Sequence, residues 1–203
     1  GRTVLSGRGN ALSLYADEGD AWDFNMDYGL SRRELSASSV EFEQDGPRAI
    51  CHVRYAFGDS VIRQDIVLTS GSRRLDFETY VDWKEQARML RVGFPVEVAP
   101  EEAVCDVQFG HLKRPAHQNT SWDAAKYEVC CQHFADLTEG DYGVALMSDC
   151  KYGYHIGEGL LDLNLLRASS YPGVKADVAE HRFTYSLYPH EGDVNQAGVL
   201  RQA

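Results

Sequence analysis

The feature that most constrains the fold of this chain is a hydrophobic alternation with a period of two residues. In the segment 74–83, apolar or β-branched side chains occupy every second position, and mostly charged side chains stand between them. Successive side chains of a β-strand point to opposite faces, so this pattern is typical of a half-buried strand. The pattern recurs in 49–57 and 61–69, and a short glycine-containing link follows each of these two segments. Residues 49–83 are therefore predicted to form a three-stranded antiparallel meander.

Further segments of the same character extend this pattern along the chain. About nine strands are expected in all, and the only helix expected is a single turn within 121–129. Pro95 lacks a backbone N–H, so the strand that contains it is expected at a sheet edge or at a bulge. Many short strands with almost no helix indicate an all-β fold, a large antiparallel β-sandwich, and a single domain over 1–203. The remaining expected strands are 11–15, 90–98, 103–109, 143–147, 160–166 and 182–187.

Composition narrows the class of protein. The chain of 203 residues carries 20 Lys and Arg against 31 Asp and Glu. Such an acidic chain is repelled by a phosphate backbone, so nucleic acid is not an expected partner. No apolar run approaches the roughly 20 residues that cross a bilayer, so no membrane partner is expected either. The cysteines are odd in number and include the adjacent pair Cys130 and Cys131, which favours reduced thiols in the cytoplasm.

Two long interruptions of the strand pattern, 17–30 and 112–142, are rich in aromatic and polar residues. Long loops on a rigid β scaffold tend to carry function. Aromatic side chains among polar residues are typical of platforms for sugar rings, although aromatics buried beside polar turns give the same pattern. The histidine spacings match no zinc motif, and Lys151 beside Cys150 is weak support for a catalytic thiol. The residues by themselves therefore leave carbohydrate binding open.

The stretch 107–123 carries a more specific signal. Its sequence, Val-Gln-Phe-Gly-His-Leu-Lys-Arg-Pro-Ala-His-Gln-Asn-Thr-Ser-Trp-Asp, closely resembles a signature of the class II α-mannosidases, glycoside hydrolase family 38, in its cytosolic and bacterial branch. Departures from the usual pattern are mild, with Ala116 for Thr, Ser148 for Asn and Ser169 for Pro. Further matches in the same order cover nearly the whole chain and lie at 20–23, 74–79, 134–137, 149–154, 163–167 and 183–190.

The resemblance implies which part of such an enzyme this chain represents. In that family an N-terminal β/α barrel carries the nucleophile and the zinc ligands, a helical bundle follows, and a large all-β region completes the chain. This sequence resembles the central part of that region, a super-sandwich similar to galactose mutarotase. The expected role is a non-catalytic β domain of a retaining, zinc-dependent α-mannosidase. It would pack on the barrel and help to close the sugar pocket. Zinc or another divalent metal is expected in the barrel, and the isolated chain, with no catalytic residue or metal ligand, is expected to be inactive.

The resemblance also implies candidate contacts with the sugar. Arg167 best matches an arginine that reaches the sugar site in relatives, and an interdomain salt bridge is its alternative role. The full set of candidate pocket residues is Arg167, Trp22, Asp23, Asp149, Lys151 and Tyr152. The last three form a compact polar turn, for which ordinary turn chemistry is the alternative.

Expected partners are the barrel and helical domains of the same chain and a mannose-containing oligosaccharide, with homo-oligomer formation left open. Two other roles also stay open at this point. One is a free-standing carbohydrate-binding module. The other is a purely structural domain that orients the barrel.

Overall fold

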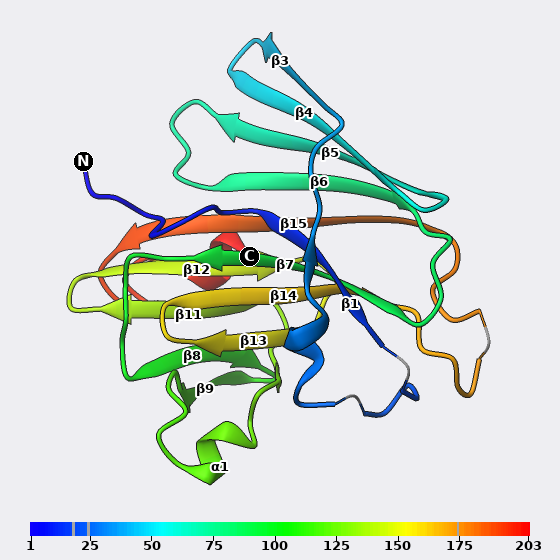
Figure 1. Ribbon diagram of the computed structural model, residues 1–203. Helices are drawn as coiled ribbons and strands as arrows, with labels where there is room; N and C mark the ends of the chain where they lie inside the picture. Colours follow the sequence, from blue (N-terminus) through cyan, green and yellow to red (C-terminus); the bar gives the residue numbers. More distant parts are fainter. Residues whose placement is uncertain (18, 24, 174) are drawn as a thin grey trace.

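The computed structural model describes residues 1–203 except positions 18, 24 and 174. The strands of these residues form two antiparallel sheets that pack face to face (Figure 1). In spatial order, the six-stranded sheet contains β10 (Val129–Cys130), β13 (Gly153–Gly157), β14 (Leu160–Arg167), β7 (Arg88–Pro95), β1 (Ala11–Ala16) and β2 (Arg33–Glu34). The nine-stranded sheet contains β3 (Ser39–Asp45), β4 (Arg48–Phe57), β5 (Ser60–Thr69), β6 (Leu75–Asp82), β15 (Glu180–Glu191), β12 (Tyr142–Ser148), β11 (Phe134–Glu139), β8 (Glu102–Val107) and β9 (Gly110–Pro115).

Helix is confined to short pieces in the described chain. These are η1 (Tyr28–Ser31), α1 (Ser121–Ala124) and α2 (Val199–Gln202). None of the described helices is long and apolar enough to cross a lipid bilayer. The predicted all-β antiparallel sandwich with little helix is confirmed, although it has more strands than the nine expected.

The core lies between the two sheets, and the alternation seen in the sequence creates it. Phe77 and Val81 of β6 point inward and are buried, whereas the intervening Glu78 points outward. The Phe77 ring lies 5.3 Å from the ring of Phe94 on β7, centroid to centroid, and stacks on Tyr185 of β15 at 4.9 Å. Burying one such side chain stabilises the fold by about 1.5–3 kcal/mol. These contacts therefore join the sheets across the centre of the sandwich.

The predicted three-stranded meander is confirmed. Strands β4, β5 and β6 pair in sequence order, and β3 adds a fourth strand at the outer edge. Gly58 and Gly71 stand in the two turns with φ of +52° and +82°. Glycine adopts this left-handed region without the steric cost that a Cβ brings, which explains why both links contain it.

The expectation for the strand containing Pro95 is wrong. Strand β7 is not an edge strand, because it lies between β14 and β1 inside the six-stranded sheet. Pro95 is its last residue, and its carbonyl oxygen accepts a hydrogen bond from the Ser6 N–H at 3.1 Å. The bulge of this region lies in β14 between Asn164 and Leu166, away from the proline. A proline at the end of a strand interrupts no interior rung of the ladder, so it is tolerated there.

The prediction of one long interruption over 112–142 is also wrong. This segment contains part of β9, then α1, β10 and β11. The single helical turn predicted within it is confirmed as α1. Thr120 caps the turn: its hydroxyl accepts the Asp123 N–H at 3.2 Å, while its own N–H donates to the Asp123 carboxylate at 3.2 Å. This reciprocal capping box stabilises a turn too short to persist by propensity alone.

A second, smaller core lies on the outer face of the nine-stranded sheet. The chain after β15 turns back over this face, where Val194 and Val199 pack against Phe134, Ala145 and Met147. The C-terminal segment therefore belongs to the packed structure of the sandwich.

Candidate functional site

Two loops meet at the end of the six-stranded sheet where β1 and β14 finish. Both strands run antiparallel to β7, which lies between them, so they end on the same side (Figure 1). The Ala21 N–H, after β1, donates to the Tyr171 carbonyl oxygen, after β14, at 2.9 Å. An isolated parallel bridge also pairs Asp20 with Tyr171. The two loops therefore form one structural unit.

Arg167 stands at the centre of this unit as the last residue of β14. Its Nε and Nη2 atoms lie 2.7 and 3.1 Å from the two carboxylate oxygens of Asp17. Nη2 also donates to the carbonyl oxygens of Asp20, at 2.7 Å, and of Asp23. The side chain of Asp17 is 0% exposed and that of Arg167 15% exposed. A bidentate pair in such a buried setting is geometrically specific, so Arg167 fixes the course of the loop that follows β1.

Trp22 and Tyr171 form an aromatic pair on the outside of the same unit. Their rings are 5.8 Å apart between centroids, and the residues are 72% and 62% exposed. The Asp20 carboxylate accepts the N–H groups of Trp22 and Asp23 at 2.9 and 3.0 Å, which holds this turn in place. Two large rings held in water beside polar groups present an apolar face to a ligand. Tyr171 was not among the residues expected from the sequence.

A polar hollow of about 590 Å³ opens beside the Arg167 cluster. Its lining includes the four aspartates Asp17, Asp20, Asp23 and Asp27. Gly19 also lines it, and a Cβ at this position would lie 2.9 Å from the Asp23 carbonyl oxygen, so the close approach requires glycine. Carboxylate oxygens only accept hydrogen bonds, so these four side chains favour a ligand that donates them.

A buried charge network anchors the other end of this loop. Arg91, on the outward side of β7, is fully buried and pairs with Asp162 and, at 3.0 Å, with Glu128. The Tyr28 hydroxyl donates to Glu128 at 2.8 Å. Burial raises the pKa of the Glu128 carboxyl, and the Arg91 guanidinium opposes this shift. The network connects η1 to the segment before β10. In the sequence, the only indication of this network is an arginine within the apolar run 89–94.

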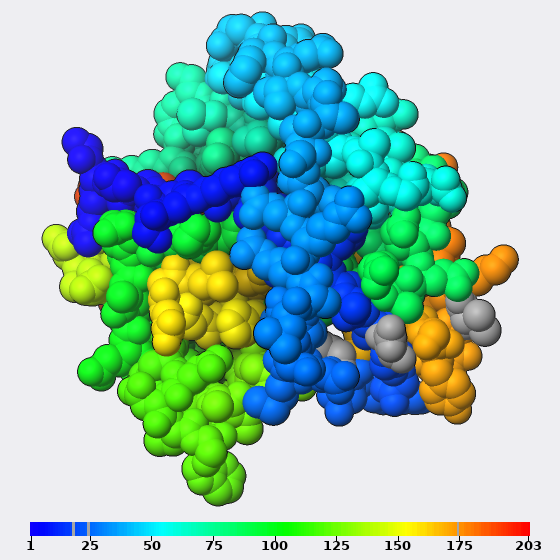
Figure 2. All heavy atoms as spheres, viewed as in Figure 1, coloured from blue at the N-terminus to red at the C-terminus, as the bar shows by residue number. Residues whose placement is uncertain are grey.

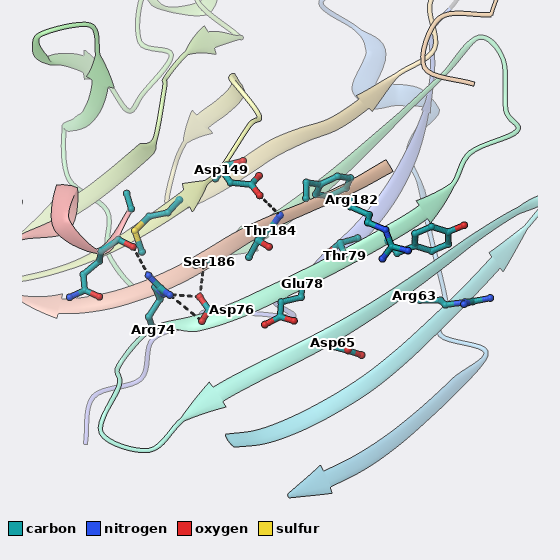
Figure 3. Close-up of a pocket in the computed structure, with 16 residues that line it drawn as sticks. Arg63, Asp65, Arg74, Asp76, Glu78, Thr79, Asp149, Arg182, Thr184 and Ser186 are labelled. Atoms are coloured by element: carbon teal, nitrogen blue, oxygen red, sulfur yellow. Dashed lines mark hydrogen bonds and ion pairs between the residues drawn. The ribbon is translucent and has the colours of Figure 1, made fainter. Parts of the chain in front are cut away.

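Asp149 lies elsewhere, in a groove on the outer face of the nine-stranded sheet (Figure 3). Its carboxylate accepts the Thr184 N–H at 2.9 Å. The same groove is lined by Arg63 and Arg182, whose guanidinium carbons lie 5.5 and 4.7 Å from the ring centroid of Tyr80. Asp149 is thus engaged with the start of β15 and makes no described contact with the Arg167 cluster.

Lys151 and Tyr152 follow in the same turn between β12 and β13. The Lys151 ammonium nitrogen lies 4.5 Å from the ring centroid of Phe183. The backbone N–H of Lys151 donates to the Ser148 hydroxyl at 3.0 Å. The Tyr152 side chain is exposed, and the backbone carbonyl oxygen of Tyr152 accepts the Cys131 N–H at 3.0 Å. The structure thus places Arg167, Trp22 and Asp23 in one loop unit, whereas Asp149, Lys151 and Tyr152 lie in a separate turn that contacts β15 and the segment after β10.

The histidines show no common centre. His133 pairs with Asp106 at 2.6 Å, and His117 lies 3.7 Å from Asp123. Over residues 1–203 without positions 18, 24 and 174, no three His, Cys, Asp or Glu side chains are grouped so that they could hold a metal ion.

Comparisons with known proteins agree with this fold. The family model for the glycosyl hydrolases family 38 C-terminal domain matches residues 1–175. Alpha-mannosidase G of Dictyostelium discoideum is 40% identical over 206 residues, covering 96% of this chain and 19% of that protein. Human Alpha-mannosidase 2C1 is 39% identical over 203 residues, with the same coverage of 96% and 19%. The crystal structure of an alpha-mannosidase from Enterococcus faecalis V583 superposes with a TM-score of 0.79 at 16% identity, covering 96% of this chain and 27% of that one.

The chain is therefore a β-sandwich domain of the glycoside hydrolases. It belongs to glycoside hydrolase family 38, and it spans about 19% of the length of the curated relatives named above.

Proposed function

We propose that this chain is the non-catalytic β domain of a retaining, zinc-dependent α-mannosidase that hydrolyses α-linked mannose. The observation that carries this proposal is the similarity to named α-mannosidases over 96% of the chain at about 40% identity. In this proposal the zinc would be held by residues of the barrel domain.

Hydrolysis with retention needs two carboxyl groups. One attacks the anomeric carbon, and the other donates a proton to the leaving oxygen and later takes one from water. Both would lie in the barrel of the intact enzyme. The contribution of this domain would be to pack on the barrel and to place the loops around Arg167 at the rim of the sugar pocket.

The Arg167 unit is suited to that rim. The bidentate pair with Asp17 fixes the loop, so the exposed Trp22 and Tyr171 rings are presented in a defined orientation. The apolar face of a mannose ring would stack on them, while its hydroxyls would donate to carboxylates around the hollow. Preorganised loops cost less entropy on binding than loops that must be ordered by the sugar.

A reducing compartment fits the cysteines. All five are free, and burial raises the pKa of the Cys150 thiol to about 11. A thiol with this pKa is protonated at neutral pH and is a poor nucleophile, which argues against a catalytic role for Cys150. We place the enzyme in the cytoplasm on this basis.

The test uses the intact enzyme and an aryl α-mannoside. Trp22→Ala should raise KM several-fold, whereas Trp122→Ala, a similarly exposed tryptophan on α1, should leave the kinetics unchanged. The isolated chain should show no turnover with or without added zinc. Equal kinetics of the two variants would remove Trp22 from the pocket, and turnover by the isolated chain would overturn the proposal that the catalytic groups lie elsewhere.

A free-standing sugar-binding module is the second candidate. The observation that favours it is that the Trp22–Tyr171 pair and the hollow are complete within this chain. Calorimetry of the isolated chain with mannose or mannobiose separates the two functions. Saturable binding that Tyr171→Ala abolishes would support the module, and no measurable binding is expected for a rim that needs the barrel.

A further inference from the structure

The nine-stranded sheet extends beyond the six-stranded sheet and leaves part of its inner face uncovered. The uncovered part is formed by β3 and the neighbouring halves of β4, β5 and β6 (Figure 1). Seen from the side of the six-stranded sheet, these strands reach the surface above the N-terminal segment (Figure 2). The inner face of a sandwich is built to be buried, so this region differs from the solvated outer face.

Apolar side chains gather on this uncovered face. Val40 and Phe42 of β3 pair in register with Val53 and Cys51 of β4, so they point to the same side as the buried Val53. Their exposures are nevertheless 51% and 82%. We call this surface the apolar shelf; it encloses a hollow of about 490 Å³, lined mainly by Phe42, Ala49, Cys51, Ile66, Leu68 and Leu75. A contiguous apolar surface of this kind marks a site of contact.

An unpaired backbone edge runs beside the shelf. Residues 4–6 pair on one side with the end of β7 and the residues that follow it: the Ser6 N–H donates to the Pro95 carbonyl oxygen at 3.1 Å, and the Val4 carbonyl oxygen accepts the Glu97 N–H at 2.9 Å. Within the described residues, no backbone group bonds to the other side of 4–6. Figure 1 shows this segment along the margin of the six-stranded sheet that borders the shelf. An open strand edge next to an apolar face is a template for another strand.

We propose that a further β-segment of the same polypeptide pairs with the free edge of residues 4–6 and covers the apolar shelf with its inward side chains. About four fifths of each curated relative lies outside the aligned part, since this chain spans only 19% of them, and we take the covering segment to lie in the corresponding part of the full-length polypeptide. Tethering gives such a segment an effective concentration in the millimolar range, which favours it over a second copy. The proposal depends on family membership and does not require the proposed activity.

The first test is site-specific photo-cross-linking in the full-length enzyme. A photoreactive phenylalanine analogue at position 42 keeps the aromatic bulk of the shelf, and the same analogue at position 41 serves as control. Glu41 pairs with His52 and points to the opposite face of the sheet. We expect position 42, unlike position 41, to form a cross-link within one chain to a peptide outside the 203 residues. Cross-linked dimers would assign the shelf to a second copy, and equal products at both positions would refute a covering segment.

The second test measures stability of the full-length enzyme. Phe42→Asp should lower Tm by several degrees, because it would place a charge in a covered apolar site. Phe109→Asp should leave Tm unchanged, since Phe109 is fully exposed at the turn between β8 and β9. Should Phe42→Asp yield no folded enzyme while Phe109→Asp folds normally, that also supports burial of the shelf. An unchanged Tm for Phe42→Asp shows that the shelf faces water.

Discussion

Arg167 and Asp17 connect the ends of two strands that are not neighbours in the sheet. Strand β7 lies between β14 and β1, yet the guanidinium of Arg167 makes two contacts with the Asp17 carboxylate, at 2.7 and 3.1 Å. Because Asp17 is fully buried, removing Arg167 would leave an unpaired buried charge, which is strongly destabilising locally. The position of the loop that carries Trp22 therefore depends on this pair.

Arg167→Ala is expected to lower kcat/KM of the intact enzyme by about 10- to 150-fold, the effect of losing one charged hydrogen-bonding group worth roughly 1.5–3 kcal/mol. Arg167→Lys should restore little, because an ammonium cannot reproduce the bidentate fork. Asp17→Asn should lower kcat/KM by a similar factor, since Arg167 then loses the carboxylate that orients it. Steady-state kinetics with circular dichroism as a folding control checks this. Full kcat/KM in Arg167→Ala would make the residue purely structural.

Gly143→Ala should destabilise the domain by about 1–3 kcal/mol through overpacking. A Cβ at Gly143 would lie 2.3 Å from the Thr138 hydroxyl and 2.5 Å from the His190 ring. His190 is buried and pairs with Asp136 at 2.6 Å, and the Thr138 hydroxyl donates to the same carboxylate at 2.6 Å, so neither side chain can move away without losing its bond to Asp136. Urea unfolding measures the change, with Gly110→Ala as control because nothing lies within 4 Å of its Cβ position. Equal midpoints for the two variants would contradict the close approach.

His52 should make stability depend on pH. Hydrogen bonds to Asp65 and Glu43 raise the pKa of its imidazole above the ordinary value. A raised folded-state pKa stabilises the fold below the unfolded value of about 6.5, and this contribution is lost as the pH rises through the folded pKa. His52→Gln should therefore reduce the unfolding midpoint in urea more at about pH 6 than at about pH 9. The same reduction at both pH values would show that protonation of His52 does not stabilise the fold.

Buried tyrosines should cause unfolding at alkaline pH. Burial raises the pKa of the phenols of Tyr28, Tyr154 and Tyr185. In the unfolded chain these groups lose their protons near pH 10, so above that pH the folded state binds more protons and stability falls as pH rises. Ultraviolet absorbance of tyrosinate should show these groups ionising only together with loss of the native circular dichroism. Complete ionisation with the fold intact would argue against their burial.

The sequence was most informative where alternation is strong. Strand β6 buries every second side chain from Phe77 to Val81, and β4 and β5 carry apolar residues at alternate positions, so the extent and pairing of the three strands could be predicted from the pattern alone. Strand β9 gives no such signal, because its first four residues are exposed on both faces. The prediction from Pro95 was wrong because a missing backbone N–H disrupts pairing inside a strand, whereas Pro95 is the last residue of β7.

The candidate site was predictable only in part. Resemblance indicated Arg167, Trp22 and Asp23 as candidates, and the structure places the three residues in one loop unit. The partner of Arg167 was not found, because Asp17 lies 150 residues away and meets it only when β1 and β14 end on either side of β7. Contacts of this kind depend on sheet order, which no local pattern encodes.

The position of β15 in its sheet determines where an expressed fragment of this region can end. This strand is the fifth of nine strands in its sheet and begins at Glu180, whereas the family model ends at residue 175. A gene fragment cut at that boundary would lack the strand that pairs with both β6 and β12, so the nine-stranded sheet would be divided into two four-stranded parts. The smallest autonomous folding unit should instead reach at least Val199, whose side chain closes the second core.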